Sequence, residues 1–456
     1  MYSLPTTRFS ARFVTLLAAV ILGACASYEP KPLVLDADLQ GVQTKTIDEV
    51  TVSVAILTDE QAEQHFGVDF ALHGLQALYI KVRNESSRRL WFIRNTVDPD
   101  FYSPDEAAVL LKGALPGDDF DALRQHLRDE SIRIQHQPLT ITEGFLYLPR
   151  VEGGRYVDVR LGGDVYESDE EDELEAGWLN ELRFGFAVPL PDGLFDYEKL
   201  DAAHTYGDVM LPDIEDPEIL REHLEELPCC ATDNDGKKMG DPLNAVLVGD
   251  SQDVLTALSR SGWSFTHRIS ISTVGRIAGA ALSGDSYPVA PVSNLYLFGR
   301  KQDFALQRAR PKISQRNHTR FWLAPFTFRG SQVWIGQVSR DIGIKVTPES
   351  PTLTTHIIDP EVDLTREYLL HSLLDAGLVA GFGFVKGSTY ATRDEPAVNL
   401  SDDPYFSDGL RLVIALSPHP RPYHEVRSMH WEQSVAPTTE GQTESAERYV
   451  RPVEKE

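Results

Sequence analysis

The sequence predicts a multidomain α+β protein, with an N-terminal β-sandwich-like domain that carries a helical insertion and a C-terminal mixed α/β domain. The length of 456 residues is enough for two large domains or three average ones. Hydrophobic residues make up 42% and aromatic residues 9% of the chain, which is typical of globular proteins with a substantial core. Strand-like runs dominate residues 44–211, whereas strand-like and helix-like runs alternate over residues 241–418.

The N-terminus has the pattern of an export signal. Arg8 and Arg12 precede an apolar run at 13–22 (FVTLLAAVIL), which is too short for a permanent membrane helix of about 20 residues. The run ends in LGAC, where small residues precede Cys25, as signal peptidases require. These four residues resemble the lipobox of bacterial lipoproteins, whose cysteine is acylated, with palmitate among the acyl groups. We therefore expect a signal peptide at 1–24 and lipidation of Cys25; an ordinary secretory signal is the alternative.

Lipidation of Cys25 would hold the chain on a membrane of a Gram-negative bacterium. Ala26 stands where an Asp would favour the inner membrane, so we expect an outer membrane lipoprotein that faces the periplasm. Residues 25–43 are polar and are interpreted as a tether. The formal net charge of −26 excludes nucleic acid as a partner and broad contact with anionic headgroups. The expected partners are the membrane, through the lipid, and another envelope protein. No cofactor and no metal are expected.

The β-rich region at 44–211 predicts strands separated by polar turns. They are expected at 51–57, 77–82, 90–93, 144–148, 155–161 and 182–188. Between them, Ser103-Pro104 opens one helical segment, and a second runs through Phe120, Leu123 and Leu127. Short strands with a helical insertion indicate a sandwich, and no catalytic constellation is present. The region is interpreted as a scaffold or spacer.

Residues 212–240 are interpreted as a connector with an acidic helix at 217–227. The adjacent cysteines Cys229 and Cys230 would form a vicinal disulfide in the oxidising periplasm, or remain two buried thiols, or bond to another chain. The DNDG sequence at 233–236 resembles part of a calcium loop. An EF-hand register would put Ala231 and Pro242 at ligand positions, so we expect a turn.

From Asp241 the chain alternates between predicted strands and helices. Strands are expected at 243–248, 294–298, 319–328, 333–338, 379–385 and 412–416, and helices after Asp250 and at 360–375. Arg329-Gly330-Ser331 indicates a hairpin between two of these strands. Residues 436–456 are polar and charged, and disorder is expected there.

Six stretches of this region carry a family resemblance. They are DPLNAVLVGD, PVSNLYLFGRKQDFALQ, RNHTRFWLAP, VWIGQVSRDIGI, THIIDPEVDLTREYLL and DPYFSDGLRLVIAL, spread from Asp241 to about Leu416. In wording and order they resemble the LssY C-terminal domain family, named after a type I secretion system component. In related proteins the domain is attached to membrane segments that resemble a lipid-phosphate phosphatase. The resemblance implies kinship more than activity.

Within this region, the strand around His318 carries candidate site residues. Alternation places His318, Arg320 and Trp322 on one face, which we expect to line a cleft or to face water. His318 and His356 could transfer protons, and Asp341 and Asp359 could orient them. An anion could bind to fixed positive charge on Arg320, Arg340 and Arg366.

Two of these residues also have a structural interpretation. Asp359-Pro360 predicts a helix N-cap with proline at the first helical position. Arg366 falls on the apolar face of that helix, where a guanidinium needs a carboxylate partner. Asp303, Asp341 and Asp408 are the candidates.

The catalytic signatures GxSxG, HExxH, the P-loop and GxGxxG do not occur in the sequence. The favoured hypothesis is therefore a non-catalytic envelope protein, a lipid-anchored adaptor whose α/β domain binds another component. The alternative is a periplasmic hydrolase acting on phosphorylated lipid or envelope glycan.

Overall fold

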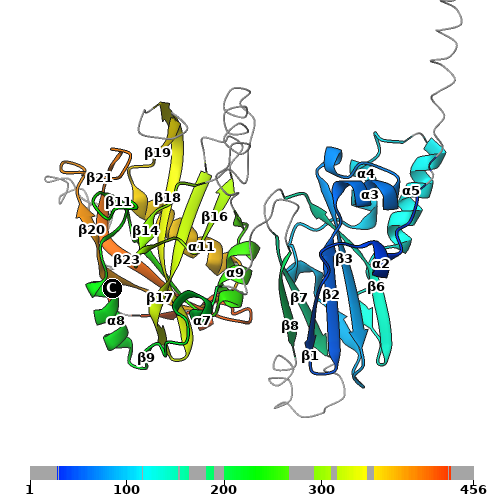
Figure 1. The fold of residues 1–456 in the computed structure, drawn as a ribbon, viewed down its shortest axis with the longest axis horizontal. Helices are drawn as coiled ribbons and strands as arrows, with labels where there is room; N and C mark the ends of the chain where they lie inside the picture. The colour runs from blue at the N-terminus through cyan, green and yellow to red at the C-terminus, as the bar shows by residue number, and fades with distance from the viewer. Residues whose placement is uncertain are drawn as a thin grey trace, which may run out of the picture.

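A computed structural model describes residue 28 and residues 30–115, 117–151, 155–163, 181–188, 200–265, 292–309, 316–346, 354–429 and 431–432. It is a mixed α+β protein with several sheets, which confirms the sequence prediction at this level (Figure 1). Cys25, the expected signal peptide and the expected disordered tail at 436–456 lie outside the described residues, as does the acidic sequence ESDEEDELE at 167–175. No helix in the described ranges is both long and apolar enough to cross a membrane.

Two four-stranded antiparallel sheets form the N-terminal part of the structure. One has the order β1 (Gln43–Ile47), β2 (Val50–Ile56), β3 (Leu75–Asn84), β6 (Thr140–Pro149). The other has the order β5 (Gln135–His136), β4 (Leu90–Phe92), β7 (Arg155–Gly163), β8 (Leu182–Val188). Both contribute apolar side chains to one buried core, among them Val52, Ile80, Leu148, Val159 and Phe184. Each strand therefore presents alternate residues to the other sheet.

Helices cover the opposite face of the first sheet (Figure 1). They are α3 (Asp59–Phe66), α4 (Pro104–Leu110) and α5 (Gly117–Asp129), with the short α2 (Leu35–Asp38) nearby. Tyr79 and Phe145 of the sheet pack with Phe66 and Leu127 of the helices. Capping boxes begin α3 at Thr58 and α4 at Ser103, satisfying backbone N–H groups of the first turn. Sequence reasoning predicted α4 and α5 but missed α3, a helix of only eight residues.

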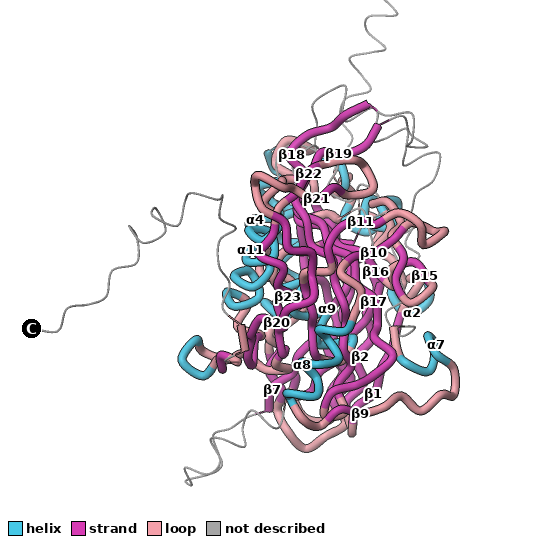
Figure 2. The backbone as a smooth tube through the Cα atoms, turned by 90° about the vertical axis from the view of Figure 1, so that its left-hand side faces the viewer, coloured by secondary structure: helices cyan, strands magenta, loops and turns pink. Residues whose placement is uncertain are grey.

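A ten-stranded sheet forms the C-terminal part. Its order is β13 (Ser264–Phe265), β16 (Phe304–Ala309), β17 (Arg316–Phe328), β18 (Ser331–Val346), β12 (Ala245–Val248), β23 (Ser407–Leu416), β20 (Val379–Ala391), β24 (Arg427–Ser428). In addition, β19 (Thr354–Ile358) pairs with β18, and β9 (Asp213–Ile214) pairs with β17. Figure 2 shows the β18 and β19 pair at one end of this sheet. The neighbours β12 and β23 are parallel, whereas β16, β17 and β18 are antiparallel.

Both faces of the larger sheet are covered. Helices α9 (Ser251–Arg260) and α11 (Val362–Asp375) pack on one face, around Phe321 and Trp334. Helix α8 (Pro217–Glu226) packs on the other face, around Trp322 and Val413. A small sheet joins α8 there, in the order β11 (Met239–Pro242), β10 (Cys230–Thr232), β14 (Tyr296–Leu297), β15 (Arg300–Lys301).

The remaining elements are short: α7 (Ala202–Tyr206), the pair β21 (Ala397–Val398) and β22 (Pro404–Tyr405), and 3₁₀ turns at Ala71–His73, Arg94–Thr96 and Tyr423–Glu425. The stretch interpreted as a connector supplies β9, α8, β10 and part of β11. Leu220, Leu224 and Ala231 of this stretch are core residues, so it packs onto the sheet along much of its length. The DNDG sequence is a turn, in which Asp233 Oδ1 accepts hydrogen bonds from the N–H groups of Lys237 and Lys238. The domain boundaries themselves stay a prediction.

Candidate functional site

A row of polar side chains crosses three neighbouring strands of the larger sheet. It consists of Gln307 on β16, Arg316, His318 and Arg320 on β17, and Gln337, Ser339 and Asp341 on β18, and we call it the polar row. The antiparallel register sets Arg316 opposite Asp341, His318 opposite Ser339, and Arg320 opposite Gln337. Because alternate residues of a strand share a face, all seven side chains lie on the face that α8 and the small sheet cover.

The polar row is buried, so the expectation that the His318 face lines a cleft or faces water is wrong. His318 and Arg320 are each 4% exposed, and the neighbouring Trp322 is fully buried. Trp322 belongs to the same core as Leu297 of the small sheet and Leu295, which comes just before β14. The carbonyl of Ser293 accepts a hydrogen bond from Arg320 Nε at 2.9 Å. The covering layer therefore seals this face, although alternate residues of β17 on it are polar.

Hydrogen bonds within the polar row compensate for its burial. Arg316 Nε donates to Asp341 Oδ2 at 2.8 Å, and Arg316 Nη1 donates to Gln307 Oε1 at 2.6 Å. Arg320 Nη1 donates to Gln337 Oε1 at 2.6 Å, and Gln337 Nε2 donates to Ser339 Oγ at 2.7 Å. Buried polar groups without such partners would cost several kcal/mol in total.

The imidazole of His318 is held at both nitrogens. Arg320 Nη1 lies 3.2 Å from Nδ1, and Asp341 Oδ1 lies 3.0 Å from Nε2. Because a guanidinium can only donate, Nδ1 must accept, and the ring proton of the neutral imidazole therefore sits on Nε2 and is donated to Asp341. His318 is thus a neutral, oriented imidazole that links a cation to a carboxylate.

Charge around Arg320 is balanced by two carboxylates. Burial lowers the pKa of Arg320, while Asp241 and Asp341 raise it. Asp241 Oδ2 lies 3.9 Å from Arg320 Nη1, and Asn399 Nδ2 donates to Asp241 Oδ1 at 2.9 Å. Sequence reasoning missed Asp241, Arg316 and the glutamines of the polar row. The alternating polar residues of both strands were the signal that could have revealed them.

Arg340 and Asp359 lie on the opposite face of the sheet from His318. Arg340 Nε donates to Asn317 Oδ1 at 2.9 Å, and Nη1 lies 3.7 Å from Asp359 Oδ2. The guanidinium also lies over the ring of Tyr368 on α11. The side chains of the neighbouring residues Arg340 and Asp341 therefore lie on opposite faces of the sheet. Of the predicted site residues that the structure describes, His318, Arg320 and Asp341 come together, and the others lie elsewhere.

The predicted cap of α11 is wrong. The helix begins at Val362, its N-cap position is Glu361, and no side chain caps it. Asp359 Oδ1 instead accepts a hydrogen bond from the N–H of Glu361 at 3.1 Å. The carbonyl of Pro360 accepts a hydrogen bond from the N–H of Phe406, and Glu361 forms an isolated β-bridge with Phe406. The backbone at 360–361 therefore pairs with the residue before β23, and the helix starts only after it.

Arg366 forms an internal ion pair on α11. It is fully buried, and its Nη1 and Nη2 donate to Asp408 Oδ1 and Oδ2 at 2.8 and 3.0 Å. Of the other two carboxylates considered, Asp303 pairs with Arg300 and Asp341 pairs with Arg316. Arg366 also makes a cation–π contact with the ring of Phe384 and donates a hydrogen bond to the carbonyl of Leu410. The side chain of His356, on β19, lies outside the described residues.

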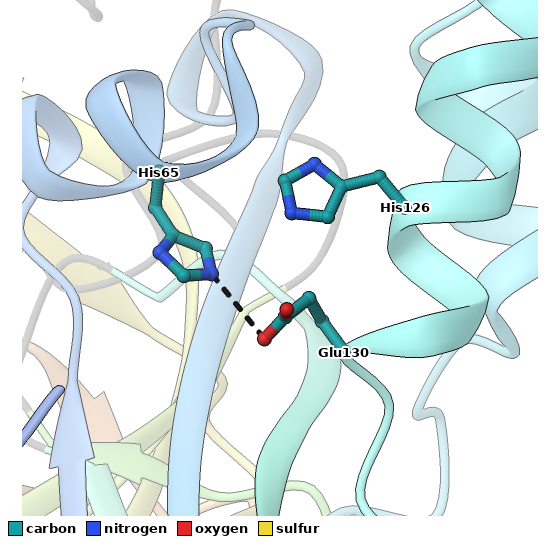
Figure 3. A group of neighbouring side chains, drawn as sticks. All are labelled: His65, His126 and Glu130. Atoms are coloured by element: carbon teal, nitrogen blue, oxygen red, sulfur yellow. Dashed lines mark ion pairs between the residues drawn. The ribbon is translucent and has the colours of Figure 1, made fainter. Parts of the chain in front are cut away.

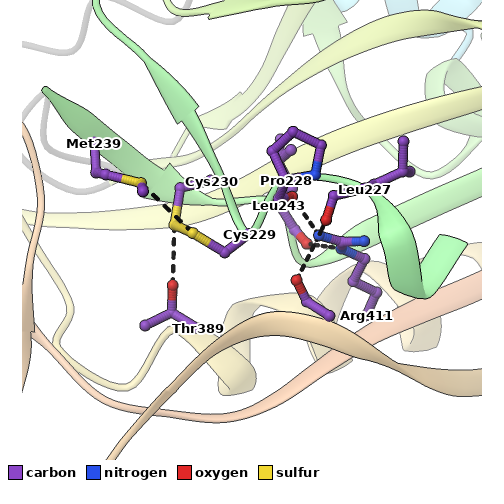
Figure 4. The surroundings of a disulfide bond; sticks show 9 residues. Leu227, Pro228, Cys229, Cys230, Met239, Leu243, Thr389 and Arg411 are labelled. Atoms are coloured by element: carbon purple, nitrogen blue, oxygen red, sulfur yellow. Dashed lines mark hydrogen bonds between the residues drawn. A yellow bond between two sulfur atoms is a disulfide. The ribbon is translucent and has the colours of Figure 1, made fainter. Parts of the chain in front are cut away.

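The adjacent cysteines Cys229 and Cys230 are joined by a disulfide at the start of β10 (Figure 4). Cys230 Sγ lies 2.9 Å from Thr389 Oγ1, and Cys229 Sγ lies 3.6 Å from Met239 Sδ. Beside them is Arg411, which sequence reasoning missed. It is fully buried and donates to five backbone carbonyls, those of Leu224, Leu227, Pro228, Leu243 and Gly387. Burial lowers the pKa of Arg411 to about 10, so the side chain remains a cation at neutral pH.

Comparison with known families identifies this region. Residues 221–410 match the model of the family described as LssY C-terminus. These residues form an LssY C-terminal domain. No curated protein and no solved structure matches the chain. The matched LssY C-terminal domain begins within α8, so it includes the cysteine pair and part of the stretch that was interpreted as a connector. The polar row, Arg340 and Arg366 all lie inside it.

Proposed function

We propose that the protein is a lipid-anchored adaptor of the bacterial envelope, whose LssY C-terminal domain binds another envelope component. In this proposal, Cys25 carries the lipid, and the chain faces the periplasm from the outer membrane. The basic residues, apolar run and LGAC sequence at the N-terminus support the anchor. The two N-terminal sheets with one shared core support a β-sandwich that acts as a spacer.

One observation carries the choice of an adaptor over an enzyme. The side chains suited to catalysis satisfy one another: both nitrogens of His318 are engaged by Arg320 and Asp341, and all three are buried. Arg340 and Asp359 pair on the other face of the sheet, and Arg366 is committed to Asp408. Side chains that are paired with one another inside the fold stabilise the domain. Binding of another envelope component would then use the outer surface of the domain.

Photocrosslinking in intact cells tests the adaptor proposal. A crosslinking amino acid would replace exposed apolar residues of the LssY C-terminal domain, such as Ile342, Tyr390 and Val398. Leu72 and Leu139, which are exposed in the N-terminal part, serve as control positions. We expect a discrete protein adduct from at least one domain position and none from the controls. Absence of adducts at every domain position would contradict the proposal.

The anchor is tested by fractionation of cells. Cys25→Ala should move the protein from the membrane fraction into the soluble periplasmic fraction, because the acyl chains are lost. Ser27→Ala is the matched control and should leave the protein on the membrane. Retention of the Cys25→Ala protein on the membrane would show that attachment does not depend on the lipid.

A second candidate function is a hydrolase acting on phosphorylated lipid or envelope glycan. The contact of His318 with Asp341, with Arg316 and Arg320 beside it, is the observation that favours it, because an oriented imidazole and fixed cations suit phosphoryl chemistry. Turnover of a phosphoester by the purified full chain, lost in His318→Gln, would support it. Turnover unaffected by that substitution would exclude His318 as the catalytic group.

A further inference from the structure

Three side chains that can bind metals meet between α3 and α5, far from the LssY C-terminal domain in sequence (Figure 3). His65 comes from the last turn of α3, His126 from α5, and Glu130 directly follows α5. One ligand atom from each residue lies within 4.8 Å of the other two. We propose that His65, His126 and Glu130 bind a divalent transition metal of the zinc class.

The donor set favours zinc over calcium or magnesium. Two imidazole nitrogens and one carboxylate are typical zinc ligands, whereas calcium and magnesium prefer oxygen alone. A fourth position would be filled by water, as in zinc sites with three protein ligands. The spacing of His126 and Glu130, four residues apart at the end of a helix, puts both on the same side of α5.

The side chain of His65 points into this cluster, where its Nε2 has a long ion-pair contact with Glu130 (Figure 3). His65 is 2% exposed, and its Nε2 makes no hydrogen bond within the described part of the chain. Glu130 Oε2 lies 3.5 Å from that nitrogen. Leaving a buried polar atom unsatisfied costs free energy, and a metal ion between His65 and Glu130 would remove this cost.

The ring of His126 is oriented toward the same place. Tyr28 Oη lies 2.7 Å from Nδ1 of His126, so Nε2 is the nitrogen that faces the cluster (Figure 3). Metal-binding histidines are held in this way by a hydrogen bond at the other ring nitrogen.

A backbone hydrogen bond links this cluster to the segment near the predicted lipid anchor. Leu33 N donates to His65 Nδ1 at 3.0 Å, so without metal the proton of the neutral ring lies on Nε2. A metal bound at Nε2 displaces that proton, and the neutral ring then carries its proton on Nδ1. Leu33 N–H loses its acceptor. Metal binding should therefore loosen the segment around Leu33 from α3.

Calorimetric titration of Zn²⁺ into the chelator-treated full chain, purified in detergent, tests the site. We expect one equivalent to bind with a Kd in the micromolar range or below. His126→Gln and Glu130→Gln should each weaken binding at least tenfold, with circular dichroism confirming that both variants fold. His424→Gln is the matched control, since His424 is an exposed histidine 3.9 Å from Glu425 and should not matter. Failure of the wild type to bind Zn²⁺, or binding by both cluster variants as tight as that of the wild type, would overturn the proposal.

Hydrogen exchange gives a second readout that does not depend on substituting the buried His65. Zn²⁺ should speed amide exchange in the peptide that contains Leu33 in the wild type, and not in His126→Gln. Unchanged exchange in the wild type at saturating Zn²⁺ would overturn the link between the metal and Leu33. Slower exchange would overturn it equally, because it would mean that the metal tightens the segment.

Discussion

Arg366 of α11 and Asp408 of β23 form a two-point ion pair, with Nη1–Oδ1 and Nη2–Oδ2 distances of 2.8 and 3.0 Å. The arginine is fully buried, and Asp363 lies 3.3 Å from its Nη1. Burial raises the pKa of Asp363, against the lowering effect of Arg366. This pair attaches α11 to β23. Without the carboxylate of Asp408, apolar packing around Arg366 would leave its buried positive charge without its closest compensating charge.

Asp408→Ala should therefore destabilise the LssY C-terminal domain strongly. Loss of the closest carboxylate leaves a buried guanidinium poorly compensated, and we expect a decrease of about 3–5 kcal/mol in the free energy of unfolding. Urea denaturation measures the change. Lys237→Ala, which removes an exposed pair with Asp235, should cost less than about 1 kcal/mol. Equal effects of the two substitutions would contradict the structural role of Asp408.

Gly144→Ala should destabilise the N-terminal part of the protein. A Cβ at this position would lie 2.7 Å from the carbonyl oxygen of Glu130 and 2.8 Å from the backbone nitrogen of Ile132, and backbone cannot move aside as a side chain can. We expect a loss of about 1–3 kcal/mol, measured by thermal or urea unfolding. Gly113→Ala is the control, because nothing lies within 4 Å of its added Cβ. A Gly144→Ala protein as stable as the control would refute this contact.

His136 should make stability depend on pH. Both ring nitrogens are buried and make no hydrogen bond within the described residues, and burial lowers the pKa to about 4. In the unfolded chain the pKa of His136 is near 6.5, so as the pH falls the unfolded state takes up this proton before the folded state does. The contribution of neutral His136 to the free energy of unfolding is therefore fully present above about pH 6.5. As the pH falls to 4, the free energy of unfolding decreases by about 3 kcal/mol through this group.

The measurement compares the wild type with His136→Leu by urea unfolding between pH 7 and pH 4. The wild type should lose more free energy of unfolding than the variant over this range, because leucine cannot titrate. His204→Leu, at an exposed position, should follow the wild type. A difference between wild type and His136→Leu that stays constant with pH would disprove the prediction.

Reduction of the bond between Cys229 and Cys230 should change stability little. A disulfide stabilises mainly by closing a loop of the unfolded chain, and adjacent residues close almost none, so we expect about 1 kcal/mol or less. Urea unfolding with and without a phosphine reductant measures it, with mass spectrometry to verify reduction. A loss of several kcal/mol would mean that the bond holds β10 in place by native contacts.

The sequence could predict the strands that carry the polar row, but not which residues face each other. Counting back from the hairpin at Arg329-Gly330 would set His318 opposite Asp341. The observed register has Arg316 there, because the pairing shifts between Leu323 and Thr327. Pro325 lies in this interval and has no N–H for the ladder, which accounts for the irregularity. The shift at this proline therefore sets which residue of β17 stands directly opposite Asp341.

The burial of the polar row also could not be predicted from the sequence. Alternating polar residues on one strand indicate an exposed face when the strand is considered alone. Here Gln307 and Asp341, distant in sequence, satisfy Arg316, and the small sheet covers the row. The cluster of His65, His126 and Glu130 was missed for a related reason, since α3 and α5, which contribute to it, lie far apart in the chain. Such groups appear only when the packing of the elements is known.

Arg411 has a consequence for how this protein can change over evolution. Its five acceptors are all backbone carbonyls, at Leu224, Leu227, Pro228, Leu243 and Gly387. Substitutions at the four positions other than Gly387 keep the carbonyls, so the side chains there can diverge while the anchoring of α8 persists. Gly387 is constrained, because its φ is +117° and an added Cβ would lie 2.9 Å from Arg411 Nη1. Lysine, with a single ammonium, could not reach as many acceptors as the guanidinium does. Divergent relatives should therefore keep this arginine, and the glycine at 387, long after the side chains at the other four positions have changed.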